Sequence, residues 1–174
     1  GEGISEVVNG EFIARHSDGT PSDGREPLDL DALFSNLNKD DPLDVPVPTE
    51  TRMGHFHLYV ANLNATRHFY HELLGFDDMG IARTFRMGMV SAGGYHHHIG
   101  FNTWQGEGAP APLSDGLGLN YFTFNLPDAE ELNRMDEMLR EAGVEYEHHA
   151  DGLFLRDPSQ NSQLLTTAEL RKEH

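Results

Sequence analysis

Residues 54–60 read Gly-His-Phe-His-Leu-Tyr-Val, and residues 66–76 read Thr-Arg-His-Phe-Tyr-His-Glu-Leu-Leu-Gly-Phe. The first stretch alternates and is rich in strand formers, which predicts a strand. The second places its apolar side chains on one face of a helix, with an N-cap expected at Asn64 and an end at Gly75. A compact unit therefore opens with a strand followed by a helix.

The same order of elements occurs twice along the chain. Strands of the first unit are expected to continue at residues 79–83, 85–91 and 96–102, and those of the second lie at 119–126, 144–148, 152–156 and 163–167. Between the first two strands of the second unit, a helix opens at Asp128 and ends at Gly143. This internal duplication predicts an α+β fold of two βαβββ units that form curved mixed sheets.

The rest of the chain surrounds these two units. The expected boundaries are an extended N-terminal arm with a short helix at residues 1–50, the first unit at 51–102, a linker at 103–118, the second unit at 119–168 and a tail at 169–174. Apolar residues at helical spacing between positions 28 and 37 predict the short helix, and a loop at 17–24 precedes it. An arm without a core of its own needs another surface to pack against.

The charge of the chain excludes two classes of partner. Its 174 residues include 29 Asp and Glu against 12 Lys and Arg, a formal net charge of −17. Nucleic acid and anionic lipid both require basic patches, so neither is an expected partner. No stretch approaches the roughly 20 apolar residues of a membrane span. With no secretory signal visible, we expect a cytoplasmic protein. The acidic, Lys-poor composition predicts a halophilic source, or else an ordinary acidic bacterial protein.

Histidines are the residues best suited to chemistry. The chain has no Cys, so His, Asp and Glu remain as metal ligands. His55 and His57 are two apart on the predicted strand and are expected to share a face with Tyr59. At least one of the two imidazoles would then reach a metal, and the alternative is a hydrogen-bonded pair on a half-exposed strand.

A second histidine motif follows the Gly-Gly turn at residues 93–94. Alternation along a strand would place His96 and His98 on one face and His97 on the other. Three consecutive imidazoles are costly in a buried strand unless their nitrogens find partners. The alternative is a solvated turn with incidental histidines. The remaining pairs, His148 with His149 and His68 with His71, are expected on the surface.

These motifs resemble the vicinal-oxygen-chelate superfamily, which includes glyoxalase I, bleomycin-resistance proteins and extradiol dioxygenases. The helix at residues 66–76 is typical of the whole superfamily. Residues 91–102, which read Ser-Ala-Gly-Gly-Tyr-His-His-His-Ile-Gly-Phe-Asn, are more similar to bacterial catechol-2,3-dioxygenase-like proteins built from four such units. On this resemblance the chain corresponds to units three and four, and residues 27–33 to the connector before them.

The resemblance implies an Fe(II) site of two His and one Glu. His55 matches the first ligand, whereas Tyr121 and Leu164 occupy the positions of the second His and the Glu. His97 matches the catalytic acid–base histidine, and Phe154 stands where a Tyr is expected. The site we expect therefore comprises the catalytic residue His97, the metal ligands His55 and His57, and the substrate-pocket residues Tyr59, His96, His98, Tyr121 and Phe154.

The implied function is part of an extradiol ring-cleaving dioxygenase, an oxidoreductase dependent on non-haem Fe(II) and O₂ and incomplete without an N-terminal half. Its partners would be a small aromatic diol, O₂, and either that half or further copies of the chain. Two alternatives remain open. One is a metal-free binding or scaffold module of the same superfamily, and the other is a glyoxalase-like metal-dependent lyase or isomerase.

Overall fold

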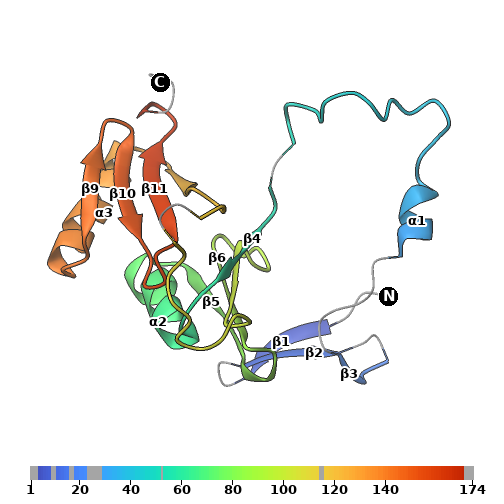
Figure 1. Ribbon diagram of the computed structural model, residues 1–174, viewed down its shortest axis with the longest axis horizontal. Helices are drawn as coiled ribbons and strands as arrows, with labels where there is room; N and C mark the ends of the chain where they lie inside the picture. Colours follow the sequence, from blue (N-terminus) through green and yellow to red (C-terminus); the bar gives the residue numbers. More distant parts are fainter. Residues whose placement is uncertain are drawn as a thin grey trace.

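The computed structural model contains two four-stranded sheets, one in each predicted unit (Figure 1). The structure describes residues 4–8, 11–15, 18–22, 29–51, 53–113 and 116–170. None of its described helices is long and apolar enough to cross a membrane.

The first unit follows the predicted order. Its elements are β4 (Phe56–Tyr59), α2 (Leu63–Arg67), the π-helical turn η1 (His68–Leu73), β5 (Asp77–Ala82), the short 3-10 helix η2 (Arg83–Phe85), β6 (Met87–Ser91) and β7 (Ile99–Asn102). The sheet order is β4-β7-β6-β5, with β4 and β7 parallel and the other pairs antiparallel.

The second unit repeats this arrangement. Its elements are β8 (Phe122–Leu126), α3 (Ala129–Glu141), β9 (Tyr146–His149), β10 (Gly152–Arg156) and β11 (Ser162–Thr167). The sheet order is β8-β11-β10-β9, and again the first and last strands of the unit are parallel. The predicted duplication and the α+β fold are confirmed.

The two units share one hydrophobic core. Phe56 and Phe122, from the first strand of each unit, have ring centroids 4.5 Å apart. Tyr70 of η1 and Leu139 of α3 are both fully buried within the same apolar cluster. Burying a side chain of this size stabilises the fold by about 1.5–3 kcal/mol. The core therefore packs the sheets of both units against η1 and α3.

Two details of the first unit differ from the predictions. The helix N-cap is Asn62 and not Asn64, because the Asn62 side chain accepts a hydrogen bond from the Ala65 backbone N–H. The last strand begins at Ile99 and not at position 96. The His96–His98 segment is therefore a loop, and strand alternation does not govern its side chains.

The N-terminal region contains more strand than predicted. β1 (Ile4–Val8), β2 (Glu11–Arg15) and β3 (Pro21–Ser22) form a small antiparallel sheet, and β2 lies beside β5. The predicted short helix is present as α1 (Leu30–Phe34). Part of the predicted 17–24 loop and most of the 169–174 tail lie outside the described residues.

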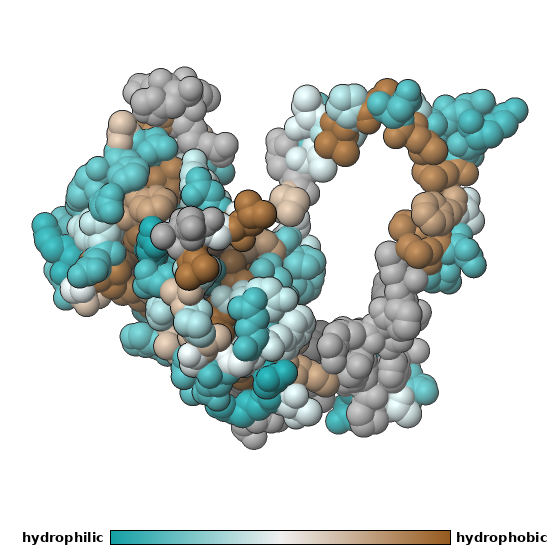
Figure 2. Space-filling model, viewed as in Figure 1, coloured by the Kyte–Doolittle hydropathy of each residue, from teal (hydrophilic) through white to brown (hydrophobic). Residues whose placement is uncertain are grey.

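After α1 the arm bows away from the two sheets (Figure 1). Its apolar side chains are exposed, and they appear as a brown band along the arm (Figure 2). The exposed apolar residues include Leu33 and Phe34 within α1 and Val47 beyond it. Within this part of the arm, α1 has no buried residue.

Candidate functional site

The parallel pairing of β4 with β7 brings the two histidine motifs together. Phe56 pairs with Ile99, and the Phe56 N–H donates to the His98 carbonyl across 3.1 Å. Gly93 and Gly94 have φ values of +64° and +77°, a conformation that suits glycine and lets the chain reverse just before the histidines. His55, one residue before β4, therefore lies next to the end of the loop.

Three imidazoles converge at this point. One ligand nitrogen each from His55, His96 and His97 lies within 4.8 Å of the other two. The His97 ring centroid is 4.5 Å from that of His55 and 4.3 Å from that of His96. His55 and His96 are exposed, and His97 is half-buried. Among the described residues this is the one group of three or more side chains suited to hold a metal ion.

The environment keeps His97 neutral. Burial, followed by the neighbouring imidazoles of His96 and His55, lowers the pKa of His97 to about 4. Burial and His55 also lower the pKa of His57. A neutral imidazole has a free nitrogen lone pair, which is the form that binds metals.

His57 lies apart from this group. Its ring packs over Gly100, where an added Cβ would come within 3.0 Å of His57 Nδ1. The same ring lies beside Trp104, with 5.3 Å between the ring centroids. The Trp104 indole N–H in turn donates to the Phe85 carbonyl across 2.8 Å. The structure thus places His57 in an aromatic wall and His55 in the group of imidazoles.

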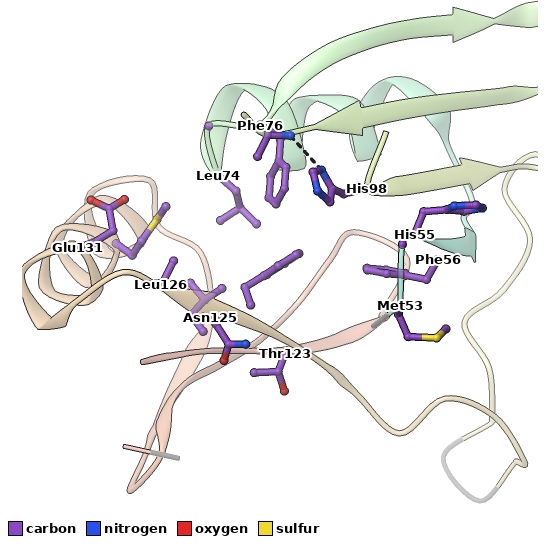
Figure 3. Close-up of a pocket in the computed structure, with 16 residues that line it drawn as sticks. Met53, His55, Phe56, Leu74, Phe76, His98, Thr123, Asn125, Leu126 and Glu131 are labelled. Carbon is purple, nitrogen blue, oxygen red and sulfur yellow. Dashed lines mark hydrogen bonds between the residues drawn. The ribbon is translucent and has the colours of Figure 1, made fainter. Parts of the chain in front are cut away.

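His98 anchors the loop. Its Nδ1 accepts a hydrogen bond from the Ala92 backbone N–H across 3.2 Å, marked by the dashed line in Figure 3. Ser91 Oγ is 3.1 Å from the same nitrogen and also hydrogen bonds to the Tyr95 carbonyl. Since Nδ1 accepts, the proton resides on Nε2. The expected shared face of His96 and His98 is wrong, because His96 and His97 both approach His55 while His98 turns inward.

A cavity of about 420 Å³ lies between the two units. His55 and His98 reach it from the first unit, and Thr123 and Leu126 reach it from β8 (Figure 3). Glu131 on α3 stands at its far side. Most of the lining is apolar, so the cavity suits a small hydrophobic group beside the histidines.

The second unit presents aromatic and aliphatic side chains at the positions of the implied metal ligands. Tyr121 packs edge-on to Phe154, with 6.2 Å between centroids, and His149 stacks on Phe154 at 5.2 Å. Leu164 is buried and pairs with Phe154 across β10 and β11. No described carboxylate joins the histidine group.

The remaining predicted residues have simpler environments. Tyr59 is 54% exposed, and its carbonyl accepts a hydrogen bond from Asn161. His148 and His149 are exposed as expected. His71 differs from the expected solvated face, because it is partly buried and hydrogen bonds to the Phe76 carbonyl.

Sequence reasoning missed Trp104 and Gly100, which position His57. A signal for Trp104 was available, since it is the only Trp of the chain and directly follows a predicted strand. No signal for Gly100 was available in the sequence, because a glycine is needed there only on account of the His57 ring that packs against it.

Comparison with known proteins identifies relatives of this architecture. A model of the "Glyoxalase/Bleomycin resistance protein/Dioxygenase superfamily" matches residues 52–161. A catechol-2,3-dioxygenase of Bacillus subtilis (strain 168) is 37% identical over 131 residues, which are 75% of this chain and 45% of the relative. The chain thus spans about half the length of this curated relative.

Solved structures share the fold. A lactoylglutathione lyase from Agrobacterium tumefaciens matches with a TM-score of 0.55 and 19% identity, covering 71% of this chain and 98% of that chain. A glyoxalase/dioxygenase from Nostoc punctiforme matches with a TM-score of 0.56 and 16% identity, covering 73% and 98%. At these identities the likeness concerns the fold alone.

Proposed function

Because the chain belongs to the glyoxalase/bleomycin resistance protein/dioxygenase superfamily, we propose that it forms part of an extradiol ring-cleaving dioxygenase. The substrates would be a catechol-like aromatic diol and O₂, and the metal would be Fe(II). The observation that carries this proposal is the 37% identity to a catechol-2,3-dioxygenase, found in a chain whose histidines gather at one site.

The histidine group suits a divalent metal. Imidazole is a good ligand for iron, zinc, copper and nickel. His55 is the ligand that the resemblance implies, and it lies beside two further imidazoles, His96 and His97. When bound, the metal would hold the two oxygens of the diol next to O₂. The chain's own contribution is to supply neutral ring nitrogens and to shape the pocket around them.

Each unit has a pair of neighbouring aromatic rings, which supports an aromatic substrate. The His57 and Trp104 rings lie close to each other on the first unit. Tyr121 and Phe154 form a similar pair on the second unit. Aromatic faces favour stacked or edge-on contact with another ring. We propose that these two walls, together with the exposed Tyr59, bind the ring of the diol.

Full activity would need residues beyond those described in this chain. The chain spans 45% of the length of the relative. Tyr121 and Leu164 cannot replace the His and Glu of a two-His-one-carboxylate iron site, since Leu164 has no donor atom. We therefore propose that a further half of the kind found in the relative, or a second copy of the chain, completes the site.

Oxygen uptake tests this function. Iron-loaded protein should consume O₂ when catechol is added, and both atoms of ¹⁸O₂ should enter a ring-opened product of the mass of the diol plus one O₂. His55→Ala should abolish uptake, whereas His68→Ala, a change at an exposed helix histidine, should preserve it. Absence of uptake both for the chain alone and for the chain joined to the upstream half of the relative would contradict the proposal.

A metal-free binding module is the second candidate. The stack of His149, Phe154 and Tyr121 favours it, because aromatic side chains fill the part of the second unit where ligands are implied. Such a module would bind catechol equally well with and without a chelator. The dioxygenase hypothesis instead predicts that chelation weakens catechol binding.

A further inference from the structure

The histidine group is complete within the first unit. His55 comes from the entry to β4, and His96 and His97 come from the loop before β7. The parallel pairing of β4 with β7, anchored by the Phe56-to-His98 backbone bond, holds these two segments together. The group therefore requires no residue of the second unit.

The three rings are not used elsewhere in the described structure. None of their nitrogens hydrogen bonds to another described residue, whereas His71 bonds to the Phe76 carbonyl and His98 to the Ala92 N–H. Their contacts are with one another, ring to ring. Three imidazoles that gather without partners have lone pairs available for a common ligand.

The separation of the nitrogens suits a shared metal ion. Two imidazole nitrogens that bind one ion at about 2.0–2.1 Å lie about 3.3 Å apart in a tetrahedral site. In the structure the three ligand atoms lie within 4.8 Å of one another. His55 and His96 are exposed, so small side-chain rotations can close the remaining gap without disturbing the core.

We propose that His55, His96 and His97 form a trihistidine site for one divalent transition-metal ion. The ligand set is entirely imidazole, which favours zinc, cobalt, nickel, copper or iron over magnesium and calcium. Three protein ligands leave positions open for water or for a substrate oxygen. The site differs from the two-His-one-Glu set that the family resemblance implies, and it gives His96 a role as a ligand.

His98 has a positioning role in this site. It does not face the metal position, and its Nδ1 is held by the Ala92 N–H on the other side of the loop. The Tyr95 hydroxyl lies over Gly54, where an added Cβ would be 3.5 Å away. Both contacts fasten the loop next to His55, so the two preceding histidines are presented together.

Metal titration of tag-free, chelator-treated protein tests the proposal without catechol or O₂. Zn²⁺ binding is measured by calorimetry and Co²⁺ binding by its visible absorption. We expect one ion per chain, with binding weakened at least about tenfold by each of His55→Ala, His96→Ala and His97→Ala. Ring ¹⁵N shifts in NMR spectra should change for these three histidines on addition of Zn²⁺. Circular dichroism checks that each variant is folded.

Matched controls identify the ligands. His68→Ala and His148→Ala remove exposed histidines outside the group and should leave metal binding unchanged. Loss of binding in His57→Gln with retention in His96→Ala would assign the metal to the β4 pair and overturn the proposal. Full metal binding by His97→Gln, with loss of turnover only, would make His97 an acid–base residue and would also overturn it.

This test is separate from that of the proposed function. A chain that binds metal through the three histidines but consumes no O₂, either alone or joined to the upstream half of the relative, supports the site and contradicts the dioxygenase. A chain that consumes O₂ while His96→Ala retains its metal supports the dioxygenase and contradicts the trihistidine site. If the wild-type protein binds no Zn²⁺ at micromolar concentration, the trihistidine site is wrong.

Discussion

Tyr70 of the first unit hydrogen bonds to Asp157 of the second, with 3.2 Å between the hydroxyl oxygen and Oδ2, and both side chains are buried. Asp157 also accepts hydrogen bonds from the backbone N–H groups of Ser159 and Asn161 and from the Asn161 side chain. Ser159 Oγ accepts from the Ala61 N–H of the first unit. One buried carboxylate thus joins the turn before β11 to the helix of the other unit.

Removing the Tyr70 hydroxyl should weaken the junction between the units. We expect Tyr70→Phe to lower the free energy of unfolding by about 1.5–3 kcal/mol, the range for a hydrogen bond to a charged group. Tyr146→Phe is the matched control, because Tyr146 bonds to Asp136 within the second unit and is only half-buried. Urea unfolding measures both. An equal or larger loss for Tyr146→Phe would contradict the role of the junction.

The backbone at position 152 requires a glycine. Its φ is +147°, and an added Cβ would lie 2.0 Å from the Leu165 carbonyl oxygen of the neighbouring strand. Gly152→Ala must therefore displace backbone between β10 and β11, and we expect it to destabilise the protein by more than about 3 kcal/mol.

Gly143 provides the control for this substitution. Its φ is +67° and nothing lies within 4 Å of an added Cβ, so Gly143→Ala meets only the intrinsic cost of the left-handed conformation, about 1–2 kcal/mol. Thermal unfolding should rank the two variants clearly. Similar melting temperatures for the two variants would show that β10 and β11 can move apart at Gly152 at little cost, which would contradict the prediction.

Periodicity alone was enough to predict the duplicated units. The alternation of β4 and the apolar stripe of α3 are local patterns, and both are present where expected. The histidine group depends instead on where β7 begins, which is set by hydrogen bonds to distant strands. The Tyr70–Asp157 contact joins residues far apart in sequence. The sheet β1-β2-β3 was not predicted, although its strands pair with their neighbours in sequence.

Acid should destabilise metal-free protein through the histidines. The folded-state pKa of His97 is lowered to about 4 from the ordinary value of 6.5. The folded protein therefore binds fewer protons than the unfolded chain between these values. The contribution of neutral His97 to the stability of the fold is fully present above pH 6.5 and is lost as the pH falls toward 4. We expect His97→Gln, but not His68→Gln, to flatten the dependence of melting temperature on pH over this window. Parallel curves of melting temperature against pH for the wild type and both variants would contradict this prediction.

Salt should stabilise the chain. A net charge of −17 generates self-repulsion in the compact state, and raising the ionic strength from about 0.1 M to 1 M shortens the screening length from about 10 Å to 3 Å. We expect the melting temperature to rise by several degrees with KCl. Most of the gain should come below about 0.5 M, as screening predicts. A neutral osmolyte at equal osmolality serves as the control, and a flat response to KCl would contradict a destabilising charge.

The contact between His57 and Trp104 can be followed by fluorescence. Trp104 is the only Trp of the chain, and its ring centroid lies 5.3 Å from that of His57. A protonated imidazole quenches a neighbouring indole more strongly than a neutral one. Because burial and His55 lower the pKa of His57, quenching should develop with a midpoint below pH 6.5. A midpoint at or above 6.5 would contradict the lowering of the His57 pKa by its surroundings.

Two variants separate the ring contact from other causes of quenching. His57→Gln should abolish the pH step. Gly100→Ala introduces a Cβ within 3.0 Å of His57 Nδ1 and should push the ring away, which weakens the step while His57 remains able to titrate. Trp104 keeps its bond to the Phe85 carbonyl in both cases, so its emission at pH 8 should hardly change. Since His57 lies in the aromatic wall and not among the three converging imidazoles, added Zn²⁺ should leave the His57-dependent step in place. A step that disappears with Zn²⁺ would place His57 among the metal ligands.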